Sequence, residues 1–234
     1  MTRRQSLGQY FLISRSVAKQ IATAANITKD DIVLEIGTGK GILIPFLCHA
    51  ANKVISFEVD KNLYAHSLEK YSAFSNLDLR CGDGFEASDN FSVFVSNLPY
   101  SESRRALEWL LQKKFSRAII MVQKEFAEKI TAKGKEKRAI SVLANYAVDI
   151  EPIIKVNKNN FQPPPKVDSV VLRLVPKKRL SKKLITLVNS LFSYKRKKIQ
   201  NIYKQFGKEV KSDKRIGDLS GDQIIEIAKQ IGKN

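Results

Sequence analysis

Short apolar runs of strand length alternate with helical patterns through the first half of the chain, and this alternation limits the folds available to it. The apolar runs that read as buried strands are residues 31–36, 53–57, 77–80, 91–95 and 117–122. Helical periodicity follows at residues 42–50 and 103–112. Strands that alternate with helices over this length form a mostly parallel sheet with helices on both faces. The pattern therefore predicts an α/β protein with a doubly wound sheet.

The first four predicted strands each end in residues that suit ligand binding. The first runs into Gly37-Thr38-Gly39-Lys40-Gly41, the second into Glu58, the third into Asp83 and the fourth into Asn97-Leu98-Pro99-Tyr100. In an open α/β sheet, ligands bind in the crevice beyond the carboxyl ends of the strands. We therefore expect these residues to meet in one site.

The glycine loop and the acid after the second strand favour a nucleoside cofactor. Glycines between a strand and a helix let the backbone approach a ligand closely. Ile42 stands where the dinucleotide fingerprint G-x-G-x-x-G has its last glycine, which disfavours a pyrophosphate. Glu58, about twenty residues past the loop, is placed to accept hydrogen bonds from ribose hydroxyls, and Asp83 could accept from an adenine amino group. A tight turn, a solvated carboxylate and an Asx-Gly turn are the alternative interpretations of these three features.

The stretch from Asn97 to Tyr100 suits recognition of a small planar group. Pro99 holds its own φ near −65° and favours an extended Leu98. The Asn97 amide and the Leu98 carbonyl could then face one group together, with the Tyr100 ring beside it. Considered alone, the stretch is more typical of a strand-to-helix turn, since Asn and Pro are ordinary turn residues, and the rest of the chain reverses that preference.

The charge balance points to a polyanionic partner. The chain carries 41 Lys and Arg residues against 23 Asp and Glu, a formal net charge of +18. Such an excess costs self-repulsion that a nucleic acid would relieve. No apolar run approaches the roughly 18 residues of a membrane span, and no signal-peptide segment follows the basic N-terminus. The two cysteines and two histidines show no metal-ligand spacing. We expect a reduced, cytoplasmic, monomeric protein without a metal.

Pro176-Lys177-Lys178-Arg179 is the predicted boundary between two domains, residues 1–176 and 177–234. Beyond it the pattern is helical at 181–195, 196–206 and 220–232. A basic cluster, Lys195, Arg196, Lys197 and Lys198, gives this small helical module a cationic face that could grip phosphates.

Two further segments contain aromatic residues that are expected to be held in defined positions. The segment 3–12 contains Leu7, Phe11 and Leu12, which would be costly to leave exposed together, so it is expected to fold over something. In the segment 161–169, three prolines fix a rigid path. Phe161 is therefore either a core residue or an aromatic aimed at a base.

Together, these segments resemble the ribosomal RNA adenine N6,N6-dimethyltransferases over almost the whole chain. The small-subunit enzymes are more similar than the macrolide-resistance enzymes. The segments that carry the resemblance are Leu7-Gly8-Gln9-Tyr10-Phe11-Leu12, Glu35-Ile36-Gly37-Thr38-Gly39, Glu58-Val59-Asp60, Gly82-Asp83, Asn97-Leu98-Pro99-Tyr100, 161–169 and the basic segment 195–201.

The resemblance implies a Rossmann-like sheet that binds S-adenosylmethionine. The residues that match the family's cofactor-binding positions are Tyr10, Leu12, Gly37, Gly39, Glu58, Asp83 and Asn97. By position, Glu58 would bind the ribose hydroxyls, Asp83 the adenine, and Asn97 would stand between cofactor and target. The sequence departs from the family at Tyr10, where Asn or His is usual, and at Ser101-Glu102, which replaces Asn-Ile.

The implied substrate is a pair of adjacent adenosines in a hairpin near the 3′ end of small-subunit ribosomal RNA, each methylated twice, within a pre-ribosomal particle. The implied catalytic residues are Asn97, Leu98, Pro99, Tyr100 and Phe161, with Tyr100 and Phe161 stacking on the extruded base. A methyltransferase acting on large-subunit RNA and a non-catalytic ribosome assembly factor remain as alternatives.

Overall fold

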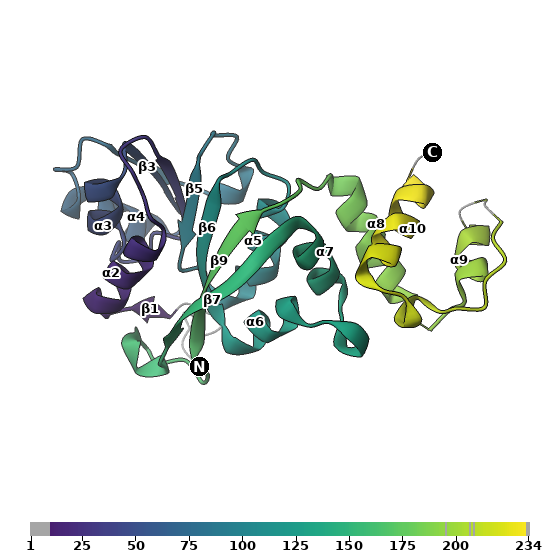
Figure 1. Cartoon of the computed structure of the whole chain (residues 1–234). Helices are drawn as coiled ribbons and strands as arrows, with labels where there is room; N and C mark the ends of the chain where they lie inside the picture. The colour runs from purple at the N-terminus through teal and green to yellow at the C-terminus, as the bar shows by residue number, and fades with distance from the viewer. Residues whose placement is uncertain (1–9, 195, 206, 208, 233–234) are drawn as a thin grey trace.

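A seven-stranded sheet forms the centre of the protein, which is known from a computed structural model that describes residues 10–194, 196–205, 207 and 209–232 (Figure 1). The strand order is β4-β3-β2-β5-β6-β9-β7. These strands are β2 (Ile32–Ile36), β3 (Lys53–Glu58), β4 (Leu77–Cys81), β5 (Val93–Ser96), β6 (Arg117–Gln123), β7 (Val148–Val156) and β9 (Ser169–Pro176).

The first five strands in this order, β4, β3, β2, β5 and β6, are parallel. Strand β9 runs antiparallel to β6, and β7 runs antiparallel to β9. The predicted α/β fold with a mostly parallel sheet is therefore confirmed. The strand order reverses between the neighbours β2 and β5. A crevice opens at such a reversal, beyond the carboxyl ends of the two strands.

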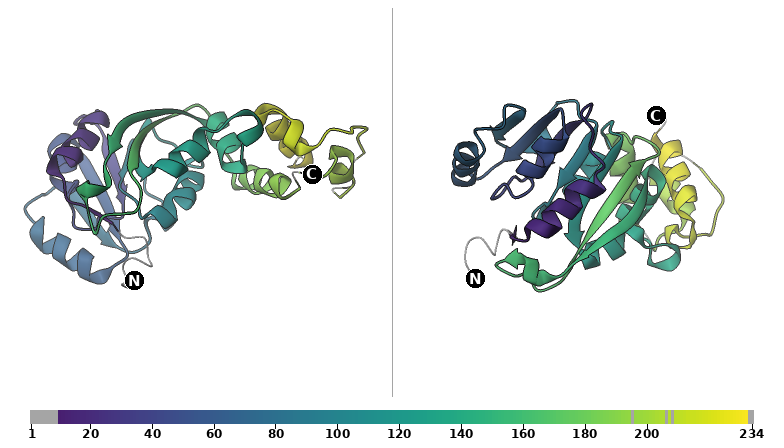
Figure 2. Two further views of the ribbon diagram at one scale, coloured as in Figure 1. Left: turned by 90° about the horizontal axis from the view of Figure 1, so that it is seen from below. Right: turned by 60° about the vertical axis from the view of Figure 1, so that its left-hand side comes forward.

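Helices cover both faces of the sheet (Figures 1 and 2). These helices are α2 (Arg15–Ala24), α3 (Ile44–Ala50), α4 (Lys61–Lys70), α5 (Ser103–Leu110), α6 (Lys124–Thr131) and α7 (Ala139–Ala147). Alternate residues of β6 show the two-sided burial. Ile119 and Met121 belong to the buried cluster that includes α2 and α3, whereas Ala118 and Ile120 belong to the cluster that includes α5 to α7. Strands buried on both faces read as continuous apolar runs, and for this reason they were predictable.

The C-terminal helices extend from one end of this layered body (Figure 2). They are α8 (Lys182–Ser193), α9 (Ile199–Gln205) and α10 (Gly221–Gly232). The chain leaves the sheet at Pro176, at the predicted boundary. Leu143 of α7, Val188 of α8 and Ile225 of α10 nevertheless belong to one buried cluster. Because this core is continuous, the division into domains 1–176 and 177–234 stays a prediction.

The helix predicted at 196–206 begins later than expected. Helix α9 starts at Ile199, and Arg196, Lys197 and Lys198 lie in the turn that precedes it. The Ile199 amide donates to the Lys214 carbonyl, and the backbone of Lys198 forms an isolated antiparallel β-bridge with that of Arg215. These contacts with a distant segment replace the first helical turn that the basic residues would have formed.

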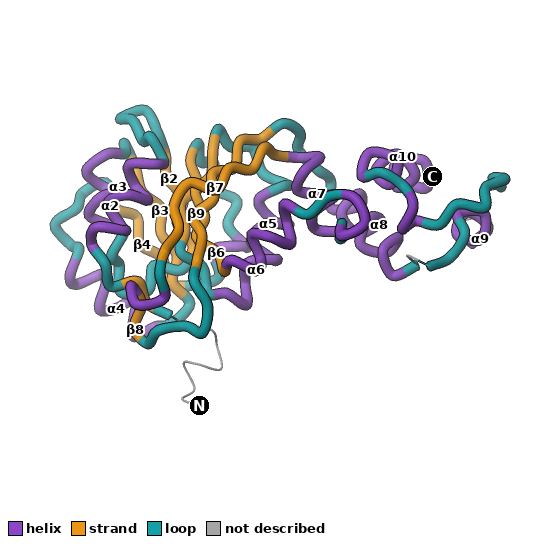
Figure 3. The backbone as a smooth tube through the Cα atoms, turned by 60° about the horizontal axis from the view of Figure 1, so that its bottom comes forward, coloured by secondary structure: helices purple, strands orange, loops and turns teal. Residues whose placement is uncertain are grey.

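The segment before the first helix folds onto the sheet layer. Strand β1 (Phe11–Leu12) pairs antiparallel with β8 (Phe161–Gln162), and the backbone traced in Figure 3 brings these two segments together. Leu12 is buried. Phe11 and Leu12 thus fold over the sheet as expected, while Leu7 lies outside the described residues.

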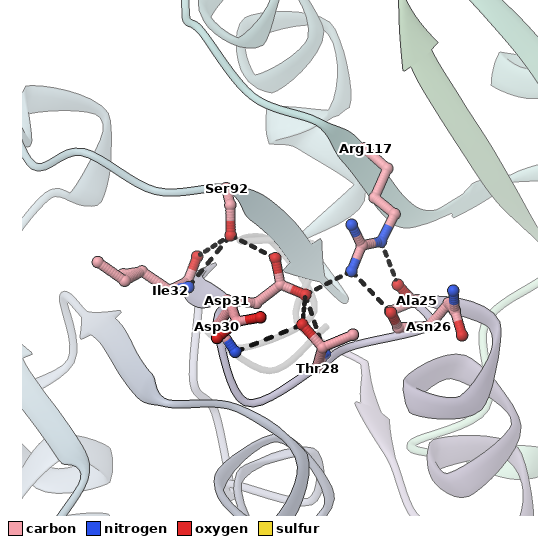
Figure 4. Close-up of polar contacts among 8 residues, drawn as sticks. All are labelled: Ala25, Asn26, Thr28, Asp30, Asp31, Ile32, Ser92 and Arg117. Carbon is pink, nitrogen blue, oxygen red and sulfur yellow. Dashed lines mark hydrogen bonds and ion pairs between the residues drawn. The ribbon is translucent and has the colours of Figure 1, made fainter.

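A polar network connects the amino-terminal ends of the parallel strands, opposite the crevice (Figure 4). Arg117, at the start of β6, donates from Nη2 to the Asp31 carboxylate at 2.6 Å and from its guanidinium to the carbonyls of Ala25 and Asn26. Asp31 also accepts a hydrogen bond from the Ser92 hydroxyl at 2.7 Å. The network therefore ties the starts of β2, β5 and β6 to the end of α2.

Among the described residues, no helix is both long enough and apolar enough to span a membrane.

Candidate active site

One cavity of about 470 Å³ lies at the carboxyl ends of the parallel strands. The predicted cofactor residues all line it: Tyr10, Leu12, Gly37, Gly39, Glu58, Asp83 and Asn97. Leu98 and Pro99 line it as well, whereas Tyr100 and Phe161 are not among its lining residues. The folded chain thus brings together residues that lie far apart in sequence.

The glycine loop is held in a shape that few other residues could adopt. Gly37 and Gly39 have φ values of +83° and +57°, in the left-handed region that favours glycine. The amides of Gly37 and Thr38 both donate to the Phe57 carbonyl, at 2.8 and 3.1 Å. The loop therefore presents bare backbone to the cavity.

Glu58 fixes this loop and still faces the cavity. Its side chain is buried, with 4% exposure of the residue. Oε2 accepts from the Gly39 amide at 2.7 Å, and Oε1 accepts from the Asp60 amide at 2.9 Å. Each carboxylate oxygen can accept a second hydrogen bond. Glu58 is thus able to accept from a pair of vicinal hydroxyls without releasing the loop.

Glu35 is a second buried acid in the cavity wall, and sequence reasoning assigned it no role. The Ser56 hydroxyl donates to Glu35 Oε2 at 2.5 Å, and the Thr38 hydroxyl lies 2.6 Å from that of Ser56. Burial, together with the negative charge of nearby Glu58, raises the pKa of Glu35 to about 8 despite the Ser56 hydrogen bond. A glutamate inside an apolar strand run, immediately before the glycine loop, was the signal that could have found it.

Asp83 lies at the rim of the cavity together with an arginine that sequence reasoning also missed. Asp83 Oδ1 accepts from the Phe85 amide at 2.9 Å, and Oδ2 accepts from Arg105 Nη2 at 2.6 Å. The Arg105 guanidinium also lies over the Phe85 ring, 4.4 Å from its centroid. The hydrogen bond that Arg105 donates to Asp83 raises the pKa of Arg105. Glu102, one of the residues that departs from the family pattern, pairs with Arg105 at 3.4 Å.

Asn97 directly follows β5 and lines the cavity. Its side chain makes no hydrogen bond with any residue that the structure describes. Pro99 has φ −52° and ψ 136°, an extended conformation that turns the chain toward Tyr100. The amide, the Leu98 backbone and the proline therefore form one edge of the cavity.

Tyr100 is anchored behind this edge. Its hydroxyl lies 2.7 Å from the hydroxyl of Ser169, a buried residue at the start of β9. Burial raises the pKa of Tyr100. The contact explains why the segment 161–169 bears on the site, since this segment ends at Ser169.

Phe161 is a core residue in this structure, the first of the two interpretations given above. It is 2% exposed and belongs to the buried cluster of β1, α2 and α3. Its backbone pairs with Leu12 through the β1–β8 ladder. The ring is therefore packed in the core together with Leu12 and does not line the cavity, contrary to the expectation that it lies at the site ready to stack on a base.

The predicted RNA-binding cluster is exposed where it is described. Arg196, Lys197 and Lys198 are all exposed, whereas Lys195 lies outside the described residues. Lys197 lies over the Tyr194 ring, and Lys198 forms an ion pair with Asp213 at 2.6 Å. The cluster is thus cationic, with one of its charges partly compensated.

The charges of the cavity fit a cationic nucleoside better than a pyrophosphate. Its lining holds four acidic residues, of which Glu35 is mostly protonated at neutral pH because of its raised pKa, and two basic ones: Glu35, Glu58, Asp83, Glu102, Lys40 and Arg105. This acidic balance stands out in a chain of net charge +18. S-adenosylmethionine offers a sulfonium, an ammonium group, ribose hydroxyls and an adenine amino group, each of which a carboxylate stabilises. Among the described residues, no group of three or more His, Cys, Asp and Glu side chains could hold a metal ion.

Solved structures share this fold. A dimethyladenosine transferase from Plasmodium falciparum superposes with a TM-score of 0.79 at 27% identity, over 95% of this chain and 98% of that one. The 23S rRNA methyltransferase ErmE superposes with a TM-score of 0.68 at 24% identity, over 95% of this chain and 100% of its own. The fold and the cavity define a Rossmann-like, S-adenosylmethionine-dependent methyltransferase.

Sequence comparison identifies the family. The ribosomal RNA adenine dimethylase family model matches residues 1–233. The ribosomal RNA small subunit methyltransferase A of Thermotoga maritima is 33% identical over 233 residues, which cover 96% of this chain and 84% of that protein. The chain belongs to the ribosomal RNA adenine dimethylase family, as the motifs predicted.

Proposed function

We propose that this enzyme transfers methyl groups from S-adenosylmethionine to the N6 amino groups of two adjacent adenosines in a 3′-terminal hairpin of small-subunit ribosomal RNA, each methylated twice. The observation that carries the proposal is the Asn97 side-chain amide, which bonds to none of the described residues and lines a cavity suited to a nucleoside cofactor. The similarity to the ribosomal RNA small subunit methyltransferase A of Thermotoga maritima supports the choice of small-subunit RNA as substrate.

The cofactor would lie along the glycine loop. The backbone at Gly37 and Gly39 would lie against the methionine part of the cofactor. Tyr10 and Leu12 from the N-terminal segment line the same cavity. Glu58 would accept hydrogen bonds from the ribose hydroxyls. Asp83 would accept from the adenine amino group, sharing Oδ2 with Arg105. The bound cofactor supplies an electrophilic methyl group on a positively charged sulfur.

Asn97 and Leu98 would orient the nucleophile. An adenine amino group is a poor nucleophile because its lone pair is delocalised into the ring. The Asn97 side-chain oxygen and the Leu98 carbonyl would each accept an N–H hydrogen bond, which favours a pyramidal nitrogen with its lone pair toward the methyl group. Positioning of this kind supplies most of the rate in our proposal, and no general base is required.

Tyr100 would stack on the extruded base. Base–aromatic stacking contributes about 1–3 kcal/mol per base, and the Ser169 contact holds the Tyr100 ring in place at no further ordering cost. Phe161 could contribute to stacking only after leaving its buried position.

The basic cluster at Lys195, Arg196, Lys197 and Lys198 would contact RNA phosphates, which position the substrate without reading its sequence. A pre-ribosomal particle in the cytoplasm is the proposed setting, with the enzyme acting as a monomer.

The proposal is tested by methyl transfer from labelled S-adenosylmethionine to unmodified small ribosomal subunits, followed by mass spectrometry of the nucleosides. N6,N6-dimethyladenosine at two adjacent positions is the expected product. Large subunits serve as the matched control substrate and are expected to remain unlabelled.

The other outcomes separate the alternatives. Labelling of large subunits alone would identify a large-subunit enzyme. Binding of cofactor and of small subunits without any transfer would favour an assembly factor. Absence of cofactor binding would show that the glycine loop has been misinterpreted.

A further inference from the structure

A second cavity, of about 320 Å³, lies where the sheet meets the C-terminal helices. Its apolar lining comes from Leu111, Phe115, Val148 and Pro176. Its other lining residues are all basic: Lys113, Lys114, Lys177, Lys178 and Arg179. These cations come from two separate segments, the end of the α5 region and the link between β9 and α8. The folded chain thus concentrates charge that the sequence keeps apart.

This junction cavity lies at the amino-terminal ends of the parallel strands, opposite the cofactor cavity. Strand β9 is antiparallel to β6, with Leu174 beside Ala118. The end of β9 therefore lies beside the start of β6, while the cofactor cavity lies beyond the carboxyl ends of the parallel strands. In Figure 1 the link to α8 leaves the sheet at the top, and the N-terminal segment lies at the bottom. Seven residues of β6 separate the two edges, a span of about 20 Å.

Within the described part of the chain, most of the positive charge at the junction cavity has no acidic partner. Lys113 donates to the Ala87 carbonyl at 3.1 Å and lies over the Trp109 ring. Lys178 lies over the Tyr146 ring, 4.6 Å from its centroid. Lys177 pairs with Asp149 at 3.0 Å. The contacts of Lys113 and Lys178 are with neutral groups and orient these side chains without cancelling their charge, whereas the charge of Lys177 is paired.

Lys114 and Arg179 are the least satisfied of the set. Both are exposed, and neither makes a hydrogen bond or ion pair with a residue in the described part of the chain. Like charges gathered around a concave surface repel one another and raise the local concentration of an anion. A concave cationic surface on a protein of net charge +18 fits a polyanion.

We infer that the junction cavity binds the sugar–phosphate backbone of a ribosomal RNA segment outside the target hairpin. Lys and Arg side chains on both sides of the cavity would contact phosphates, and the apolar lining would pack against the sugars. Because the cavity faces away from Asn97, RNA bound there is a second segment, brought near by the fold of a larger RNA. The inference rests on the proposed function, since it adds a contact with the same substrate.

The test compares a large RNA with a short one. The variant is Lys114→Gln/Arg179→Gln, which removes two charges without removing any contact seen in the structure. The matched control is Lys19→Gln/Lys70→Gln, on the exposed faces of α2 and α4, far from the junction in Figure 1. The affinity of each protein is measured, over a range of salt concentrations, for unmodified small-subunit ribosomal RNA and for a synthetic target hairpin.

For the large RNA, the junction variant is expected to bind roughly tenfold more weakly, and its slope of log affinity against log salt should fall by about 1.5, since each phosphate contact contributes about 0.7–0.9. Its affinity for the hairpin and for S-adenosylmethionine should remain that of the unmodified protein. The charge-reversed Lys114→Glu/Arg179→Glu variant should extend the loss for the large RNA alone.

Equal losses in the junction and control variants would overturn the inference, because they would reflect net charge only. An equal loss on the hairpin and on the large RNA would also overturn it, because the cavity would then hold the target hairpin itself. Failure of the unmodified enzyme to methylate small subunits would contradict the proposed function, while the binding comparison would still decide the inference.

Discussion

The ring of Tyr10 lies against the ring of Tyr100, with centroids 5.2 Å apart and planes inclined by 34°. Tyr10 lines the cofactor cavity and Tyr100 does not. Tyr10 therefore shields Tyr100 from the cavity. The residue that departs from the family pattern thus covers the ring proposed to stack on the target base.

Replacing Tyr10 should make Tyr100 easier for a base to reach. Aromatic pairs contribute about 0.5–1.5 kcal/mol, so a base that displaces Tyr10 loses this contact. We expect Tyr10→Asn to lower the KM for RNA by about 2- to 12-fold, while Tyr10→Phe leaves it unchanged. Steady-state methylation with varied RNA measures this. A higher KM in Tyr10→Asn would instead mean that Tyr10 itself stacks on the base.

Asn97 should affect turnover and not cofactor affinity. We expect Asn97→Ala to lower kcat by about 100-fold or more, since misplacement of a reacting group by 1 Å can cost this much. The dissociation constant of S-adenosylmethionine, measured by calorimetry, should stay within a factor of about three, as the proposed ribose and adenine contacts remain. Unchanged turnover would contradict the assignment.

The parts of the fold that follow from local pattern were predictable. Strands β2 and β3 are mostly apolar and are buried on both faces, and their positions follow from the local run of apolar residues. Helix α4 was not predicted, because Ser67 is its one residue buried in the structure. Helix α9 begins late because Ile199 bonds to Lys214, a contact that no local pattern encodes.

The candidate site divides in the same way. Glu58 and Asp83 could be found because Glu58 ends β3 and Asp83 lies two residues beyond β4, where the sheet geometry alone places them at the crevice. Arg105 could not, since its approach to Asp83 depends on how α5 packs. The role of Phe161 was undecidable from sequence because its burial depends on pairing with β1.

Phe161 is expected to act on stability. Truncating a buried phenylalanine costs about 3–5 kcal/mol, so Phe161→Ala should lower the free energy of unfolding by that amount, measured by chemical denaturation. Phe161→Leu keeps most of the volume and should cost less than about 1.5 kcal/mol. If Phe161→Ala had the same free energy of unfolding as the unmodified protein and raised only the KM for RNA, the ring would be a stacking residue after all.

Asp31 should make the protein sensitive to acid. Burial alone would raise the pKa of Asp31, but hydrogen bonds from Ser92, the Thr28 amide and Arg117 hold it below its usual value. A lowered folded-state pKa contributes stability above the unfolded value of about 3.9, and this contribution is lost as the pH falls through the folded value. Asp31→Asn should therefore lower the free energy of unfolding by about 1.5–3 kcal/mol at pH 7.

The difference between Asp31→Asn and the unmodified protein should shrink as the pH falls below about 4. The control is Asp30→Asn, which changes an exposed neighbour and should have little effect at either pH. A difference that persisted unchanged to low pH would show that the Arg117 network does not depend on the Asp31 charge.

Glu35 should have the opposite pH dependence. Burial raises its pKa in the folded protein to about 8, so at pH 7 the folded state holds a proton that the unfolded state has released. Its contribution to stability is therefore fully present below about pH 4.3, the unfolded value. It is lost as the pH rises toward 8, by up to about 1.4 kcal/mol per pH unit. Glu35→Gln cannot ionise and should avoid this loss.

Chemical denaturation at pH 5, 7 and 9 measures the effect. The stability of Glu35→Gln relative to the unmodified protein should increase from pH 5 to pH 9, because only the unmodified protein must bury a carboxylate at high pH. Glu69→Gln, on the exposed face of α4, is the control and should show no such trend. A difference that did not vary with pH would mean that the Ser56 and Thr38 hydroxyls stabilise Glu35 as an anion.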